Sequence, residues 1–181
     1  MKSILSEFYC PLNIDVESFL KNKAIEFGKQ GISITQLIFK SYKDRPVLVG
    51  YFTLANKQIT IDEKKLSKSQ RKRIHKFGVQ DSVTKRTIIP MPLIAQLGKN
   101  YFNEYNNLIN GGDLLQIAID QAAEAQRIIG GRFIYLECED IPRLIEFYKR
   151  NGFKSFGARD LDPDELDTFK SKRLIQMLRH I

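Results

Sequence analysis

The loop before the longest apolar helix pattern is the part of this 181-residue sequence best suited to hold an anion. Residues 107–112 read NLINGG and run directly into that pattern. The first N–H groups of a helix have no intrahelical partner and lie at the positive end of its dipole. Glycine lets an anion approach closely, and asparagine tolerates a positive φ. The candidate phosphate-binding residues are Asn107, Asn110, Gly111, Gly112 and Asp113, although most such turns are simple connections and Asp113 can serve the helix dipole itself.

A second candidate binding region is a basic segment from Lys64 to Arg86. It contains nine basic residues and one acidic residue, so it carries a net charge of +8, equal to that of the whole chain. Such a block attracts phosphates by Coulomb steering and counterion release, which favours RNA as a partner. A solvated surface helix without a partner is the alternative. The candidate RNA-binding residues are Lys68, Arg71, Lys72, Arg73 and Lys76.

The periodicity of the remaining sequence predicts the elements that must position these residues. Strands are predicted over residues 5–10, 36–42, 47–61, 87–99, 133–138, 153–158 and 173–178, and helices over residues 67–77, 112–129 and 141–150, with a first helix from an Asp15 cap to Phe27. Pro90 and Pro92 remove two backbone donors, so the strand that contains them should be irregular or lie partly at an edge. This order predicts one domain over residues 1–181, with a mixed α/β fold in which a twisted sheet of about six to seven strands carries helices on both faces. The basic segment is an insert at about residues 62–86.

The segment FYKRNGF at residues 147–153, on a helix that follows a buried strand, resembles the F/L-Y-x-x-x-G-F signature of the GNAT acyl-CoA N-acyltransferases. The order strand, phosphate-type loop, helix, strand, helix is similar to that family over nearly the whole chain. Further segments are most similar to the toxin-type GNATs of bacterial toxin–antitoxin pairs, which acetylate the amino group of aminoacyl-tRNA. These segments are Phe8-Tyr9-Cys10, Phe19-Leu20 with Ala24, residues 48–55 and Pro90 before residues 93–98.

The resemblance implies acetyl-CoA as cosubstrate and direct attack of a primary amine on its thioester. It implies that backbone groups of Leu97, Gly98 and Lys99 pair with the pantetheine arm. Tyr148 would be the general acid for the departing thiolate, with an amphipathic packing residue as the alternative. Glu137 and Glu139 could accept the amine proton, although each also fits a structural or surface role. An antitoxin protein and a homodimer are the partners that the resemblance suggests.

The resemblance favours the amino group of aminoacyl-tRNA as the acceptor, and a small amine or a protein amino group is the alternative within the same class of enzyme. A different alternative is a degenerate GNAT domain that binds RNA or a protein without turnover, because Asn107 and Asn110 depart from the family's phosphate-loop pattern. No apolar run reaches the roughly 18 residues of a membrane span, and no signal peptide is visible, which predicts a cytoplasmic protein. Two cysteines and two histidines without ligand spacing predict no metal site.

Overall fold

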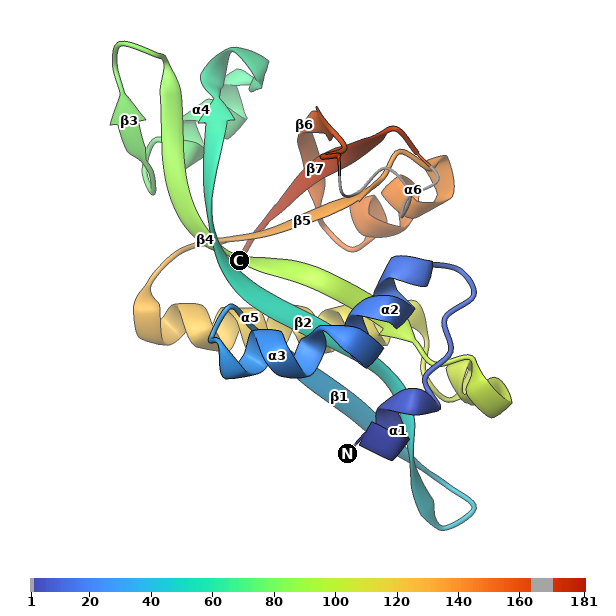
Figure 1. The fold of residues 1–181 in the computed structure, drawn as a ribbon. Coiled ribbons are helices and arrows are strands. Elements are labelled where there is room, and N and C mark those ends of the chain that lie inside the picture. The colour runs from blue at the N-terminus through green and yellow to red at the C-terminus, as the bar shows by residue number, and fades with distance from the viewer. Residues whose placement is uncertain (1, 164–170) are drawn as a thin grey trace. The chain divides into compact units, whose positions relative to one another are not determined.

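The computed structural model describes residues 2–163 and 171–181, and the chain forms two compact units. Unit 1 is built from the described residues of Met1–Ala55 and Ile94–Gln121, and unit 2 from those of Asn56–Leu93, Ala122–Asp162 and Lys170–Ile181. Three long elements pass from one unit into the other, namely two strands and a helix (Figure 1).

The described residues form a seven-stranded mixed sheet in the order β1-β2-β4-β5-β7-β6, with β3 paired to β4. Its strands are β1 (Ser33–Tyr42), β2 (Arg45–Asp62), β3 (Val79–Asp81), β4 (Arg86–Lys99), β5 (Phe133–Glu139), β6 (Lys154–Asp160) and β7 (Arg173–His180). The helices are α1 (Lys2–Ser6), α2 (Ile14–Asn22), α3 (Ala24–Lys29), α4 (Lys68–Ile74), α5 (Gly111–Ile129) and α6 (Pro142–Arg150), with 3₁₀ turns η1 (Glu63–Lys65) and η2 (Phe102–Leu108). β4 and β5 are parallel, with Leu93 opposite Tyr135. The pairs β1–β2, β3–β4, β5–β7 and β6–β7 are antiparallel. The predicted mixed α/β fold is confirmed.

In unit 1, α2 and α3 cover one face of the β1–β2 hairpin (Figure 1). Their apolar residues pack with Leu5, Phe8 and Tyr51 in a buried cluster. The phenol of Tyr51 crosses that cluster and donates to the carbonyl of Val16 at 2.5 Å. Gly98 of β4 lies so close to α2 that an added Cβ would overlap Cγ1 of Val16. The end of β4 is therefore held tightly against α2.

In unit 2, a second buried cluster lies between strands β2, β4, β5, β6 and β7 and the insert. Its members are Ile59, Ile61, Leu66, Ile74, Ile89, Met91, Phe133, Tyr135, Phe156 and Leu178. Ile74 of α4 is 1% exposed, so the basic helix is anchored by one apolar side chain while its polar side faces outward. The insert is thus a packed part of unit 2.

Two predictions for the N-terminal region are wrong. Residues 5–10 do not form a strand. α1 ends at Ser6, and the side chains of Leu5, within that helix, and Phe8, just after it, are both buried. The helix predicted to start from an Asp15 cap is α2, and its cap is Asn13, because Asn13 Oδ1 accepts from the Val16 N–H at 3.2 Å. That helix also stops at Asn22, and α3 begins at Ala24. The short strand β3 was not predicted.

Candidate active site

The N-terminal turn of α5 is closed by the side chain of Asn110. Its Oδ1 accepts from the N–H of Asp113 at 2.8 Å, and its Nδ2 donates to Oδ2 of Asp113 at 2.5 Å. This arrangement satisfies one of the free helix donors and leaves those of Gly111 and Gly112 at the positive end of a 19-residue helix. Asn107 lies before this turn on exposed chain, where its Oδ1 accepts from Asn106 at 3.2 Å. Asn110 is therefore paired with Asp113, and the N–H groups of Gly111 and Gly112 are still available to an anion.

Lys99 brings a positive charge to the same loop. Its ammonium donates to the carbonyl oxygens of Asn106 at 2.9 Å and Ile109 at 3.2 Å, and it lies 6.0 Å from the centre of the Tyr101 ring. The lysine at the end of β4 thus ties the η2 segment to the strand. An ammonium beside a helix N-terminus adds to the attraction for an anion. Sequence reasoning placed Lys99 here only by resemblance, and its carbonyl contacts had no sequence signal.

The neighbouring residues Leu97 and Gly98 sit in the last part of β4 within unit 1. Leu97 is half-buried and Gly98 is buried. An added Cβ at Gly50 of β2 would lie 2.8 Å from the carbonyl oxygen of Gly98 and 3.0 Å from Leu114 of α5. Glycine at position 50 therefore lets β2, β4 and α5 approach one another closely.

Tyr148 projects from α6 in unit 2. The turn Asn151-Gly152, in which Gly152 has a φ of +84°, folds the chain back so that the Phe153 N–H donates to the Tyr148 carbonyl at 3.1 Å. The Tyr148 ring then packs edge-on against buried Phe153, with centroids 5.9 Å apart. The FYKRNGF sequence thus shapes a helix end that fixes this tyrosine.

The phenol of Tyr148 has no hydrogen-bond partner within residues 2–163 and 171–181. Burial, with a smaller contribution from Cys138, raises the pKa of Tyr148 above its ordinary value. A tyrosine phenol is protonated at neutral pH already at its ordinary pKa, so burial keeps the proton on Tyr148 and also makes the phenol a weaker acid. The role of Tyr148 as general acid stays a prediction.

Glu137 of β5 is engaged by Arg159 of β6. Arg159 Nε donates to Oε1 at 2.9 Å and to Oε2 at 3.0 Å, and its Nη2 donates to Oε2 at 2.8 Å. The phenol of the fully buried Tyr135 also donates to Oε1, and Gln176 Nε2 donates to the Tyr135 oxygen at 3.0 Å. Burial by itself would raise the pKa of Glu137, but the bonds from Arg159 and Tyr135 and the charge of Lys57 outweigh it and lower the pKa. A carboxylate held this way is a weak base.

Glu139, two residues further along β5, is 7% exposed. Its Oε2 accepts from the Ser171 N–H at 3.1 Å, which connects the end of β5 to the chain that enters β7. The structure therefore gives Glu139 a partner in unit 2 that suits a structural role.

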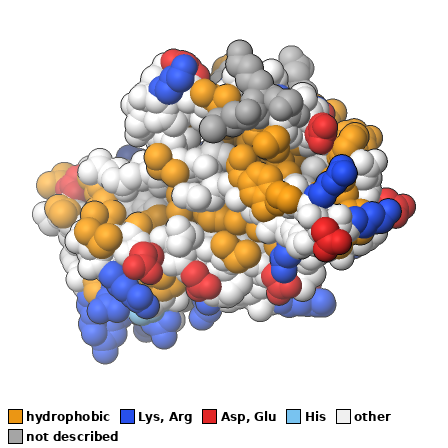
Figure 2. All heavy atoms as spheres, turned by 90° about the horizontal axis from the view of Figure 1, so that it is seen from below, with side chains coloured by type: hydrophobic (Ala, Val, Ile, Leu, Met, Phe, Trp, Pro, Cys, Tyr) orange, Lys and Arg blue, Asp and Glu red, His pale blue; other side chains and the backbone are white. Residues whose placement is uncertain are grey.

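The predicted RNA-binding residues lie on α4 and just after it. Lys68, Lys72, Arg73 and Lys76 are exposed, whereas Arg71 is half-buried and donates to the Glu63 carbonyl at 2.9 Å. The carboxylate of Glu63 accepts from Thr87 at 2.6 Å and lies 2.9 Å from His75 Nε2. Figure 2 shows Lys and Arg side chains gathered at one corner of the face it presents. One candidate cation, Arg71, is thus partly used inside the insert.

Among the described residues, no group of His, Cys, Asp and Glu side chains could hold a metal ion. None of the described helices is long and apolar enough to cross a membrane. Cys10 and Cys138 are free and buried, and burial raises the pKa of both thiols.

A mixed sheet flanked by helices, a capped α5 turn after β4 and a tyrosine on the helix after β5 are the architecture expected of a GNAT fold. Solved structures with this fold match the chain. AtaT complexed with acetyl-methionyl-tRNAfMet matches with a TM-score of 0.63 and 17% identity over 94% of this chain and 85% of that one. A tyrosine-to-phenylalanine mutant of KacT matches with a TM-score of 0.63 and 19% identity over 94% and 85%.

AtaTR bound with acetyl-CoA matches with a TM-score of 0.55 and 16% identity over 94% of this chain and 83% of that one. No family model matches the chain, and neither does any curated protein sequence. At these identities the similarity establishes the fold, so this chain has the fold of the GNAT-type toxins AtaT and KacT.

Proposed function

We propose that this protein is an acetyl-CoA-dependent N-acetyltransferase and that its acceptor is the amino group of aminoacyl-tRNA. The observation that carries this proposal is the match over 94% of the chain to AtaT, which was solved with acetyl-methionyl-tRNAfMet. Tyr148 also supports it, because its phenol has no hydrogen-bond partner among the described residues and lies on the helix that carries the GNAT signature. Residues 1–181 would then act as one catalytic domain.

The residues around the α5 turn suit the pyrophosphate of acetyl-CoA. The N–H groups of Gly111 and Gly112 and the helix dipole favour an anion, and the Lys99 ammonium adds a full positive charge. One carboxylate, Asp113, opposes it, but the carboxylate is turned to Asn110 and exposed to solvent. Backbone groups of Leu97, Gly98 and Lys99 would hold the pantetheine arm. Acetyl-CoA supplies an acetyl group activated as a thioester.

In the proposed reaction, the substrate amine nitrogen forms a bond to the acetyl carbon and the carbon–sulfur bond breaks. Tyr148 gives its phenolic proton to the departing sulfur, and the amine loses one proton. Catalysis of this kind needs positioning and proton management, without a protein nucleophile. Solved variants of both AtaT and KacT carry phenylalanine in place of one tyrosine, a change that removes only the phenolic hydroxyl.

We propose that water accepts the proton that the substrate amine loses. Glu137 is held by Arg159 and has a lowered pKa, and Glu139 is buried with Ser171 as a partner. Glu137 is therefore poorly suited to accept a proton at neutral pH. A structural role for both fits their contacts in unit 2.

The exposed cations of the insert support tRNA as the acceptor. Lys68, Lys72, Arg73 and Lys76 present their charges to solvent, and each phosphate they contact releases counterions. A neighbouring solved structure holds AtaT with the C-terminus of its antitoxin AtaR, so an antitoxin partner is part of this proposal. A cytoplasmic location follows from a charged-tRNA substrate.

The test is acetyl transfer from acetyl-CoA to a panel of charged tRNAs, with peptides and polyamines as competing acceptors. We expect transfer to charged tRNA, and Tyr148→Phe should lower kcat by about 10²–10⁴-fold with a smaller change in KM. Tyr42→Phe, a hairpin tyrosine in unit 1, is the control and should keep full activity. Turnover of peptides or polyamines alone would replace tRNA as the acceptor, and no binding of acetyl-CoA would leave the degenerate-domain alternative.

A further inference from the structure

A pocket of about 540 Å³ opens at the C-terminal end of α5 in unit 2. It is lined by Phe77 of the insert, by Gln126 and Arg127 of α5, and by Gly130, Gly131 and Arg132, which connect α5 to β5. Its volume falls within the range of small-molecule sites. None of these residues has a part in the proposed acetyl transfer, which uses the other end of α5.

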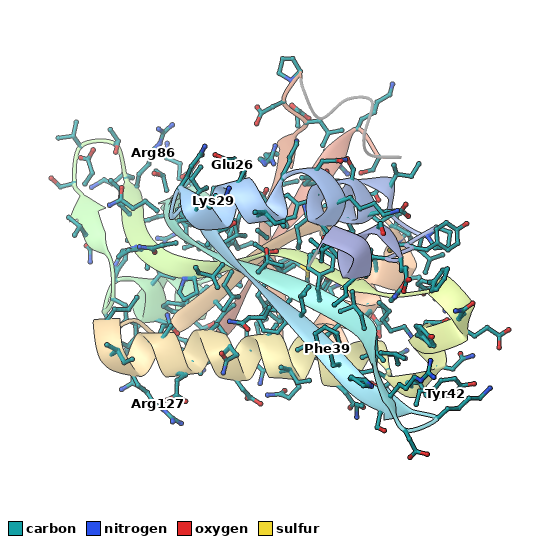
Figure 3. All side chains as sticks on the ribbon, turned by 60° about the horizontal axis from the view of Figure 1, so that its bottom comes forward. Glu26, Lys29, Phe39, Tyr42, Arg86 and Arg127 are labelled. Atoms are coloured by element: carbon teal, nitrogen blue, oxygen red, sulfur yellow. The ribbon has the colours of Figure 1, made fainter. Side chains whose placement is uncertain are left out.

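Positive charge gathers around this pocket from separate chain segments. Arg127 projects away from α5 into solvent, with its side chain 78% exposed, and its nearest carboxylate is Glu124 at 3.8 Å (Figure 3). Arg132 is exposed on the connection to β5. The pKa of His180 is lowered by burial and by the charges of Arg73 and Arg132, so those two guanidinium groups lie near the same imidazole. The mouth of the pocket is therefore suited to a phosphate.

The wall of the pocket contains an unused hydrogen-bond acceptor. Gln126 is 5% exposed, and its Nε2 donates to the Phe133 carbonyl at 2.8 Å. Its Oε1 is buried and has no donor within the part of the chain that the structure describes. Buried carbonyl oxygens are nearly always paired, so this oxygen has an unused capacity to accept from an N–H group. A side chain at residue 131 would crowd this amide, since an added Cβ there would lie 2.5 Å from Gln126 Nε2, and Gly131 avoids it.

The pocket also offers an aromatic face. Phe77 is 39% exposed, and its ring is held by an edge-on contact with Phe133 at 5.7 Å and a tilted contact with His180 at 6.1 Å. A ring fixed on one side and open on the other can stack a planar heterocycle.

We propose that this pocket binds one nucleotide, with the phosphate on Arg127 and Arg132, the base against Phe77 and an N–H of the base donated to Gln126. Arginine forks match phosphate oxygens, and nucleobases carry both a π face and ring or exocyclic N–H donors. The nucleotide can be free in solution or part of an RNA strand, and the chemistry of recognition is the same. The site is independent of acetyl-CoA and of Tyr148.

The test is titration of the full-length protein, without acetyl-CoA, with AMP, CMP, inorganic pyrophosphate, a short fluorescent single-stranded RNA and uncharged tRNA. We expect nucleotide or RNA binding that falls about tenfold in each of Arg127→Gln and Arg132→Gln. Lys29→Gln, which removes a charge from α3 in unit 1 (Figure 3), is the charge-matched control and should leave affinity within about twofold. Equal affinities in all three variants would overturn the proposal.

Phe77→Leu separates base recognition from simple attraction of anions. It should weaken AMP or RNA binding about tenfold while leaving pyrophosphate binding unchanged, because leucine keeps the apolar contact with Phe133 but has no π face. Unchanged AMP and RNA affinity in this variant would also overturn the proposal. Binding of AMP or CMP alone identifies a free nucleotide as the ligand, and binding of RNA without mononucleotide binding identifies a nucleotide within a strand. Absence of both in the wild type contradicts the site, whatever the outcome of the acetyltransferase assay.

Discussion

The pair of Arg159 and Glu137 should govern the stability of unit 2, and Arg159→Ala tests it. In the variant, Glu137 loses three contacts of 2.8–3.0 Å and, among the described residues, keeps the contact with Tyr135 and a longer 3.4 Å contact with Gln176. The Glu137 side chain is 11% exposed, so water replaces little of what is lost. Breaking a buried ion pair by removal of one partner costs about 3–5 kcal/mol. Because the Arg159 side chain is itself 26% exposed, we expect about 2–3 kcal/mol at pH 7.

The loss should depend on pH with a defined sign. The pKa of Glu137 is lowered in the folded protein although burial opposes this, so its ionised form stabilises the fold. That stability is fully present above the unfolded-state pKa of about 4.3 and disappears as the pH falls through the lower folded pKa. Arg159→Ala lacks this contribution at every pH. The difference in the free energy of unfolding between wild type and variant should therefore be large at pH 7 and shrink below about pH 4.

Urea unfolding followed by tyrosine fluorescence and far-UV circular dichroism measures this difference, since the chain has seven tyrosines and no tryptophan. The double variant Glu137→Gln/Arg159→Ala should recover part of the loss, because no uncompensated charge remains buried. Arg150→Ala, which removes an exposed i, i+4 partner of Glu146, should cost at most about 0.5 kcal/mol. A loss in Arg159→Ala no larger than in Arg150→Ala, or one that stays constant from pH 7 to pH 3.5, would refute the reasoning.

Two further variants test the positions that shape unit 1. Gly98→Ala should destabilise the protein by about 1–3 kcal/mol in urea unfolding, because the new methyl overlaps Val16, whereas Gly28→Ala, whose nearest atom would lie 3.9 Å away, should be neutral or slightly stabilising. Asn110→Ala should cost about 1 kcal/mol of stability by removing the α5 cap. It also releases the Asp113 carboxylate from Asn110, so calorimetry should find weaker acetyl-CoA binding, and unchanged affinity would count against an anion site at this turn.

Local patterns predicted most of the sheet. The turn sequence at residues 43–46 marked the β1–β2 hairpin, and in the structure Lys43 and Asp44 take up the positive φ values of a tight turn. The apolar spacing along residues 112–129 marked α5, which begins one residue earlier at Gly111. Apolar runs marked β4, which contains Pro90 and Pro92, and the buried strand β5 after Gly130-Gly131. Each of these signals acts within one element, so periodicity suffices to find it.

The N-terminal errors have a tertiary cause. The aromatic and apolar residues 8–10 before Pro11 suggested a strand, but Leu5 and Phe8 fill the unit 1 cluster, and the Cys10 N–H donates to Glu17 at 2.8 Å instead of to a sheet. Propensity is a weak guide when a short segment can bury its apolar residues without a ladder.

The partners of the candidate site residues were beyond sequence reasoning. Glu137 and Arg159 lie 22 residues apart on two strands that are joined through β7, and nothing in either segment marks the other as its partner. The partners of the Lys99 ammonium were equally hidden, because it donates to backbone carbonyls, which have no sequence signature. Residue types indicated which groups could do chemistry, whereas the pairing decided which of them are free to do it.

The distribution of positive charge is the clearest case. Segment counting assigned the whole net charge of +8 to Lys64–Arg86 and treated the rest of the chain as neutral. In the folded unit 2, Arg71 donates to the Glu63 carbonyl. The charges of Arg73 and of Arg132, which lies outside the insert, both lower the pKa of His180. Charges that cancel along the sequence therefore need not cancel on the surface, because their acidic counterparts lie elsewhere. The surface available to a polyanion is consequently set by the insert together with the end of α5, and neutralising the insert alone should leave Arg127 and Arg132 to bind phosphate.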